Sequence, residues 1–232
     1  MLPEFGQHSV HVWHLRLDQQ PWQQHIALLS QQQRQRLESF RGEDLRRRYC
    51  VCHAGLRTVL SLYLGIDPQA IEFDVGEQGK PSIAEGDNPS GLTFNISHSG
   101  ERAIFAIASR RAIGIDLEAV RNVSHLDGIL KRYFCEDERI YCNSLGQDRL
   151  IAFFRLWTCK EALSKAMGLG LQMGLDKCAV CWGDQPYFTQ LPEAYGVNWR
   201  PFSLEAAPGW IAALVIDDSL CQIDYFDCAA FF

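Results

Sequence analysis

The chain has 232 residues, 47% of them hydrophobic, and a formal net charge of −6 at pH 7. This length buries roughly 70% or more of the unfolded surface, enough for one large domain or two small ones. The acidic balance argues against a nucleic-acid binder, and no apolar run approaches the roughly 18 residues of a membrane span. The N-terminus lacks the pattern of a signal peptide, so we expect a soluble, cytoplasmic protein.

The first half of the chain predicts a strand, a long helical segment and three more strands. Alternating apolar residues predict a strand at 11–17, and helical periodicity over 22–64 ends at Gly65. The next three strands are bounded by Gly, Pro and Asn turns and lie at 71–75, 92–97 and 103–109.

The second half repeats this order. "IGIDLE" predicts a strand at 113–118, and helices are expected at 126–145 and 148–168. Four strands follow, at 178–182, 202–206, 210–216 and 221–226. We therefore predict an α+β fold with two similar halves, residues 1–112 and 113–232, that form a pseudo-dimer. With no long linker between them, the halves should share an interface, with the active site in the cleft.

Two carboxylates, Asp116 and Glu118, fall on one face of the strand predicted at 113–118. Like charges on one strand face repel each other, so they either reach water or an arginine, or hold a hard cation. Mg²⁺ takes oxygen ligands and is usually held by one or two carboxylates together with substrate phosphates. The missing side chain at Gly114 leaves room on this face for a ligand.

The helix predicted at 148–168 offers a third carboxylate, Glu161, one turn before Lys165. The same spacing is typical of an ordinary surface ion pair worth about 0.3–0.5 kcal/mol, so both interpretations stay open.

Two turns carry groups that suit an anion. In "FNISHSG", Ser97 and His98 lie where a strand enters a Ser-Gly turn, although a loop histidine is usually just solvated. Lys80 lies in a Gly-Lys-Pro turn that is not a P-loop, because Asp74 and Pro81 replace the glycine and the Ser/Thr of that motif.

The nine cysteines are expected to be reduced and buried. Cys178 and Cys181 form a lone C-x-x-C, and the nearest further ligands, Cys50, Cys52 and His53, fall on a helical stretch, which disfavours zinc.

These stretches, in this order, resemble the 4′-phosphopantetheinyl transferases, specifically the surfactin-type group with a single two-half chain. That family has a G-x-D-x-E strand and a W-x-x-K-E-A-x-x-K helix, which here read GIDLE at 114–118 and WTCKEALSK at 157–165. The match extends upstream through FNISHSG and GKPSI to the basic helix at 43–57 and covers about residues 30–170.

The resemblance implies that the chain moves the 4′-phosphopantetheine arm of coenzyme A onto a serine of an apo acyl or peptidyl carrier protein and releases 3′,5′-ADP. Asp116, Glu118 and Glu161 would hold Mg²⁺, for which Mn²⁺ can substitute. Glu161, or water on the metal held by Glu118, would take the serine proton. Lys165 would stabilise the attacked phosphate and the leaving group.

The resemblance also implies contacts to coenzyme A. Ser97 and His98 would contact its 3′-phosphate, Arg47 and Lys80 would grip the nucleotide phosphates, and Lys160 would be a further phosphate contact. Because both halves belong to one chain, the resemblance implies a monomer.

Carrier proteins are acidic, and so is this chain, so recognition needs a local patch. Candidates are Arg110, Arg111, Lys131 and Arg132 with exposed hydrophobics of the 126–145 segment, although a solvated face explains these charges equally well. Two other functions are a catalytically inactive coenzyme A or carrier-binding module, and an unrelated metal-dependent phosphoryl transferase. The lack of a P-loop, kinase motif or G-x-G-x-x-G turn disfavours the latter.

Overall fold

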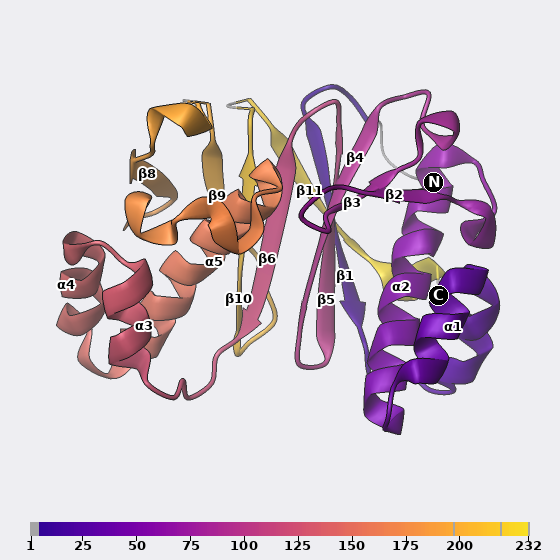
Figure 1. Cartoon of the computed structure of the whole chain (residues 1–232), viewed down its shortest axis with the longest axis horizontal. Coiled ribbons are helices and arrows are strands. Elements are labelled where there is room, and N and C mark those ends of the chain that lie inside the picture. Colours follow the sequence, from indigo (N-terminus) through magenta and orange to yellow (C-terminus); the bar gives the residue numbers. More distant parts are fainter. Residues whose placement is uncertain (1–4, 197, 219, 232) are drawn as a thin grey trace.

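The computed structural model describes residues 5–196, 198–218 and 220–231. Two sheets stand side by side in the middle of the molecule, with helices on their outer sides (Figure 1). The strand order is β11-β1-β5-β4 in the first sheet and β6-β10-β9 in the second. Two small hairpins, β2-β3 and β7-β8, lie outside these sheets.

The described part of the first half contains five strands and two α-helices. They are β1 (Ser9–Arg16), α1 (Gln31–Ser39), α2 (Glu43–Leu64), β2 (Phe73–Val75), β3 (Pro81–Ile83), β4 (Leu92–Ser99) and β5 (Arg102–Ser109). The helical segment predicted over 22–64 is thus divided into a 3-10 helix at Trp22–Leu28, α1 and α2. Ser30 caps α1 by accepting a hydrogen bond from the Gln33 N–H, and α2 ends at Gly65 with φ +68°, a left-handed conformation that suits glycine.

In the second half, the described residues form six strands and three α-helices. They are β6 (Ile113–Ala119), α3 (Leu126–Tyr133), α4 (Glu136–Ser144), α5 (Arg149–Met167), β7 (Ala179–Trp182), β8 (Pro186–Gln190), β9 (Arg200–Leu204), β10 (Trp210–Ile216) and β11 (Gln222–Asp227). The helix predicted at 126–145 is two helices, because the chain is extended at Phe134 and Cys135 before α4 begins.

The last strand joins the two halves. β11 pairs in parallel with β1, from Ser9 opposite Gln222 to His14 opposite Asp227. The boundary between 112 and 113 stays a prediction, but the first half's sheet takes its edge strand from the end of the chain.

The molecule has four layers: α2, the first sheet, the second sheet and α5. Apolar side chains alternate between the two faces of the strands, so each sheet can pack on both sides. Trp13, Leu15 and Phe105 pack in the core between the first sheet and α2. Val12 and Ile104 pack on the opposite face in the core between the two sheets, which also contains strand residues of β6 and β10. This burial of successive residues on opposite faces follows from the strand period of two.

The nine cysteines are free thiols, and six of them are buried: Cys50, Cys52, Cys142, Cys159, Cys178 and Cys228. Burial raises the pKa of these six thiols, as expected for small hydrophobes. Within the described residues, no helix is long and apolar enough to cross a membrane.

Candidate active site

Asp116 and Glu118 lie on the face of β6 that packs against α5. Their neighbours Ile115 and Leu117 point the other way, into the core between the sheets. Asp116 is buried at 5% exposure, whereas the Glu118 side chain is 21% exposed. The strand therefore places one carboxylate deep in the junction and the other at its rim.

Gly114 allows α5 to come this close. A Cβ atom at Gly114 would lie 2.0 Å from the Ala162 carbonyl oxygen and 2.3 Å from the Ala166 nitrogen. Any side chain would push the helix away from the strand. The prediction that this glycine leaves room for a ligand is wrong, because helix backbone fills the space.

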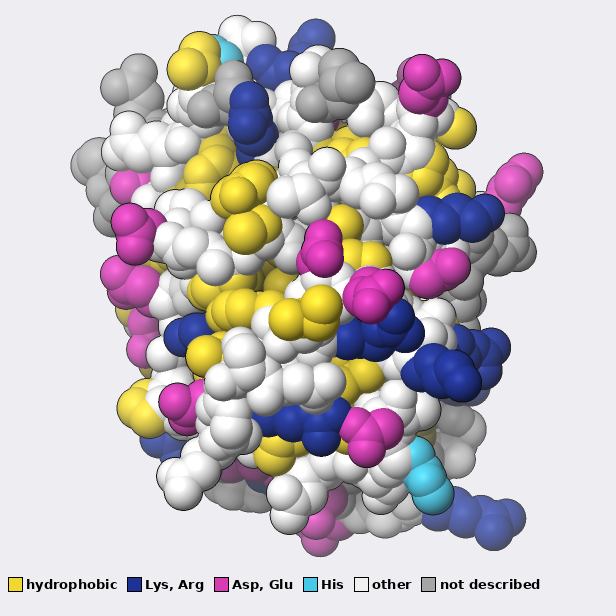
Figure 2. Space-filling model, turned by 90° about the vertical axis from the view of Figure 1, so that its left-hand side faces the viewer, with side chains coloured by type: hydrophobic (Ala, Val, Ile, Leu, Met, Phe, Trp, Pro, Cys, Tyr) yellow, Lys and Arg dark blue, Asp and Glu magenta, His cyan; other side chains and the backbone are white. Residues whose placement is uncertain are grey.

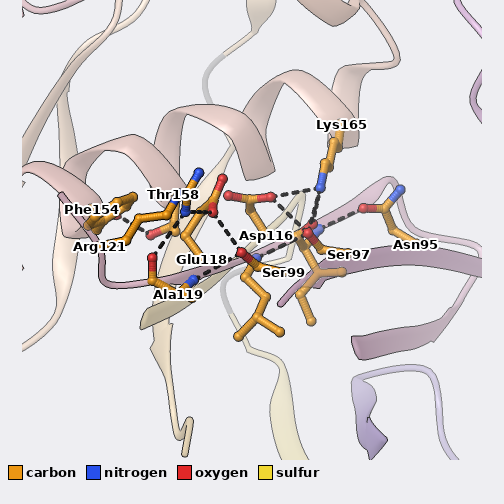
Figure 3. A network of polar contacts seen from close by, with 12 residues as sticks. Asn95, Ser97, Ser99, Asp116, Glu118, Ala119, Arg121, Phe154, Thr158 and Lys165 are labelled. Atoms are coloured by element: carbon orange, nitrogen blue, oxygen red, sulfur yellow. Dashed lines mark hydrogen bonds and ion pairs between the residues drawn. The ribbon is translucent and has the colours of Figure 1, made fainter. Parts of the chain in front are cut away.

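Lys165 reaches from α5 across to β6. Its ammonium group donates to Asp116 Oδ1 at 2.7 Å, to the Ser97 hydroxyl at 2.9 Å and to the Ile115 carbonyl at 3.1 Å (Figure 3). The partner that the structure gives Lys165 is therefore Asp116, a residue of another element, rather than a neighbour on its own helix.

Glu161 belongs to the same electrostatic cluster. Desolvation raises its pKa, and the negative charges of Asp116 and Glu118 raise it further, against the opposing effect of Lys165. Desolvation also raises the pKa of Asp116, although Lys165 and the Ser97 hydroxyl stabilise its charged form. The charges of Asp116 and Glu118 thus both act on Glu161, and the sharing of a cation by the three carboxylates stays a prediction.

A hard cation fits these donors in chemistry and charge. Asp116 Oδ2 is buried without a hydrogen-bond partner, and oxygen ligands are those that Mg²⁺ prefers. Among the described residues, however, no three His, Cys, Asp or Glu side chains are already gathered around one point. The cation would therefore have to gather them, and would compete with Lys165 for Asp116.

The residues expected to contact coenzyme A lie in different environments. His98 is exposed. Its pKa is lowered, first by loss of hydration near the protein surface and then by the charges of Lys165 and Arg48. Ser97 is buried, and its hydroxyl is committed to Asp116, Lys165 and the Leu117 N–H. The expected contact between Ser97 and a phosphate is corrected on this ground.

Arg47 and Lys80 are tied to the protein itself. Arg47 bonds to Asp44 at 3.0 Å and pairs with Glu101 at 3.3 Å, so it must leave these acids to meet a phosphate. Lys80 donates to the carbonyls of Ile113 and Ala166, at 3.0 and 3.1 Å, and burial lowers its pKa to about 8. It thereby fastens the β2–β3 hairpin to the junction of β6 with α5.

Lys160 is a buried structural residue. Its side chain has no exposed surface and pairs with Glu138 at 2.8 Å. The same ammonium donates to the carbonyls of Tyr133, Leu175 and Cys178. The expectation that Lys160 contacts a phosphate is corrected, because the group is enclosed on the side of α5 that packs against α4 and the following turn.

The structure has two notable hollows, and the first lies beside this junction. One, of about 560 Å³, is lined by Lys80, Arg111, Ile113 and Gly168, among others. A wider groove of about 1120 Å³ runs between α1, α2 and β4, and its lining includes Arg36, His53, Arg57, Phe94 and Ile96.

Sequence reasoning missed three polar residues that belong to this network: Asn95, Ser99 and Arg121 (Figure 3). Asn95 and Ser99 alternate with Ser97 in "FNISHS", and strand periodicity was a signal that they share one face. Arg121 Nη1 donates to Glu118 Oε2 at 2.8 Å, so this rim carboxylate does meet an arginine.

This fold and site define a two-half α+β protein with a carboxylate and lysine cluster at the junction of its halves. Two family models match the chain: "4′-phosphopantetheinyl transferase, N-terminal" over residues 13–110, and "4′-phosphopantetheinyl transferase superfamily" over residues 112–215. Each half of the chain thus has its own family match.

Curated relatives agree. The chain is 34% identical over 216 residues to 4′-phosphopantetheinyl transferase HetI of Nostoc sp., a match that covers 92% of this chain and 85% of that protein. It is also 34% identical over 202 residues to 4′-phosphopantetheinyl transferase Sfp of Bacillus subtilis, covering 85% of this chain and 86% of the relative. The chain belongs to the 4′-phosphopantetheinyl transferase superfamily, and the family and enzyme class predicted from the sequence are confirmed.

A solved structure of Bacillus anthracis holo-(acyl-carrier-protein) synthase, in complex with coenzyme A (3′,5′-ADP), is also similar. It matches 45% of this chain and 93% of its own length, at 22% identity and a TM-score of 0.38.

Proposed function

We propose that this chain transfers the 4′-phosphopantetheine arm of coenzyme A to a serine of an apo acyl or peptidyl carrier protein and releases 3′,5′-ADP. The observation that carries the proposal is the cluster of Asp116, Glu118, Glu161 and Lys165 where β6 packs on α5. The cluster also disfavours the catalytically inactive alternative, because no member of it is replaced.

In this reaction the serine oxygen bonds to the phosphorus next to the pantetheine, and the bond from that phosphorus to the bridging oxygen breaks. Glu161, or a water molecule held by Glu118, takes the serine proton. Lys165 exchanges Asp116 for the phosphate oxygens and stabilises charge on the leaving group.

Mg²⁺, with Mn²⁺ as a substitute, would be held by Asp116, Glu118 and Glu161. The unpartnered Asp116 Oδ2 and the electrostatic coupling of the three carboxylates support this assignment. When bound, the ion supplies charge neutralisation on the pyrophosphate.

The nucleotide of coenzyme A would lie in the groove of about 1120 Å³, which offers the exposed cation Arg36 and the apolar side chains of Phe94 and Ile96. Arg57 also lines this groove, but it is buried and donates to Gln33 and to the carbonyls of Pro68 and Ile71. His98, on the same face of β4 as Phe94 and Ile96, would meet the 3′-phosphate and gain a proton from that contact. Arg47 and Lys80 are further candidates, once freed from their present partners.

The carrier would approach over α3 and α4. On this face apolar side chains lie between basic and acidic ones (Figure 2), and Ile140 is 59% exposed. Lys131 and Arg132 are exposed on α3. Arg110 and Arg111 do not join them, because they precede β6 whereas α3 follows it, and a seven-residue strand spans roughly 20 Å. The patch expected from these four basic residues is therefore divided, and we keep its α3 part.

The test is incubation with coenzyme A, Mg²⁺ and a panel of apo carrier proteins, with the mass of each carrier as the readout. One phosphopantetheine should be gained by at least one carrier, EDTA should prevent the gain, and Mg²⁺ or Mn²⁺ should restore it. Coenzyme A binding without any mass gain would support the inactive binding module instead. Full transfer in EDTA would remove the metal from the proposal. Size-exclusion chromatography should show a monomer, since one chain supplies both halves of the site.

A further inference from the structure

The two sheets meet at β4 and β6 without backbone pairing between these strands. Among the strands that the structure describes, β4 pairs only with β5, and β6 only with β10, so each strand is the edge of its own sheet. Edge strands expose N–H and C=O groups that need partners.

Side chains of β4 supply these partners in a regular ladder. Asn95 Oδ1 accepts from the Ile115 N–H at 2.8 Å, Ser97 Oγ from Leu117 N–H at 3.1 Å, and Ser99 Oγ from Ala119 N–H at 3.1 Å. Every second residue of one strand thus meets every second residue of the other, with a constant offset of 20 positions.

The two serines use their remaining hydrogen for the carboxylates. A hydroxyl offers one donor and two acceptor sites. Ser97 donates to Asp116 Oδ1 at 2.9 Å, and Ser99 donates to Glu118 Oε2 at 2.9 Å (Figure 3). Each serine therefore connects a backbone N–H of β6 to the carboxylate one residue earlier, which fixes the carboxylate relative to its own strand.

We propose that this ladder is a positioning device for the carboxylate cluster, and that Ser99 is a positioning residue that acts through Glu118. This inference rests on the proposed metal site. Without the Ser99 hydroxyl, Glu118 keeps only the flexible contact with Arg121, whose side chain is 57% exposed. Groups that orient metal ligands typically change metal affinity 10–100-fold when removed.

The test measures Mn²⁺ affinity of the full chain saturated with coenzyme A and without carrier, by electron paramagnetic resonance of free Mn²⁺. Ser99→Ala should weaken Mn²⁺ binding about tenfold or more, and Ser99→Thr, which keeps the hydroxyl, should restore it. Thr93→Val is the matched control. Thr93 lies on the same face of β4, but its hydroxyl donates its one hydrogen to a backbone carbonyl, that of Arg111 at 2.8 Å or that of Ala108 at 3.2 Å, and not to a carboxylate, so affinity should not change.

Glu118→Gln supplies a second test, of whether Ser99 acts on the metal through Glu118. If Ser99 acts through Glu118, Ser99→Ala should have no further effect on Mn²⁺ affinity in that background. Ser99→Cys, a poor hydrogen-bonding group of similar size, replaces Ser99→Ala if the latter fails to fold.

A lower melting temperature with wild-type Mn²⁺ affinity would overturn the proposal and leave Ser99 as a purely structural contact. Failure of the wild-type chain to bind Mn²⁺ would overturn the metal assignment itself, and the inference about Ser99 with it.

Discussion

Lys160 and Lys165 lie five residues apart on α5, and each pairs with a carboxylate, yet their surroundings are opposite. The pair of Lys160 with Glu138 has exposed fractions of 0% and 2%, and backbone carbonyls enclose the ammonium group. Lys165 is 30% exposed, and its partner Asp116 keeps an unpartnered oxygen. Lys160 holds α5 to its neighbours, whereas the more exposed Lys165 is the lysine that we propose for the chemistry.

Lys160→Met should give the largest change in stability. It leaves Glu138 as an uncompensated buried charge, which typically costs about 3–5 kcal/mol. The melting temperature should fall by roughly 6–20 °C for a chain of this size. Coenzyme A affinity, measured below the melting transition, should stay near wild type.

Glu138→Gln in the same chain provides the control, because it removes the stranded charge and keeps a carbonyl acceptor for one of the two N–H groups, those of Cys135 and Val180, that the carboxylate binds. The double variant should recover part of the lost stability. A stable Lys160→Met variant that no longer binds coenzyme A would show that Lys160 is a ligand contact after all.

Lys165→Met should have the opposite effect, a large loss of activity with a smaller loss of stability. kcat should fall by roughly 10²–10³, the effect of losing one electrostatic stabiliser, while KM for coenzyme A changes much less. The melting temperature should fall less than for Lys160→Met, because Asp116 can take up a proton once the Lys165 ammonium group is gone. Steady-state kinetics and a melt on the same sample measure both effects. A near-wild-type kcat would make both lysines structural.

The two lysines show where sequence reasoning reaches its limit. Strand and helix periodicity predicted the two α+β halves, because these follow from local pattern. The shared site of the three carboxylates was inferred from the family resemblance and stays a prediction. The partner of Lys160, 22 positions earlier on α4, and the partner of Lys165, on β6, depend on packing between elements. No local pattern reports that packing.

The hydrogen-bond ladder between β4 and β6 could not be predicted from the sequence either, because it also depends on packing between elements. Alternation places Ser97 and Ser99 on one face of β4, but their acceptors and donors lie on the edge of another sheet. Pairing through side chains leaves no hydrophobic pattern that a sequence could show. The need for glycine at position 114 was also not visible in the sequence. It arises because the backbone of α5 packs directly against this residue, and not because a turn requires glycine there.

A related comparison applies to two histidines of the first half, the half-buried His53 and the exposed His98. His98 is exposed, and the 3′-phosphate of coenzyme A is its proposed partner. Dephospho-coenzyme A should bind the wild type about 1.5–3 kcal/mol more weakly than coenzyme A. His98→Ala should narrow this difference in calorimetry. Equal affinities of the wild type for the two molecules would disprove the assigned contact.

His53 should instead affect how stability depends on pH. Loss of hydration, followed by the positive charges of His98 and Arg57, lowers its pKa to about 4, so the folded chain keeps this ring neutral. The unfolded chain takes up a proton near the ordinary pKa of 6.5. Stability is therefore fully present above pH 6.5 and is lost as pH falls toward 4. Between pH 7 and pH 5 the loss from His53 should be about 1–2 kcal/mol.

His53→Gln should flatten this slope without removing it, because burial also lowers the pKa of His11, His14 and His25, which add to the acid sensitivity. Urea denaturation of both chains at pH 7, 6 and 5 measures the difference. His53 also lines the wider groove, so the variant must be compared with His98→Ala in the coenzyme A experiment. If His53→Gln removes the preference for the 3′-phosphate and leaves the pH slope unchanged, the roles of the two histidines are reversed. A cation at His53 would then be stabilised by the bound phosphate rather than excluded by the fold.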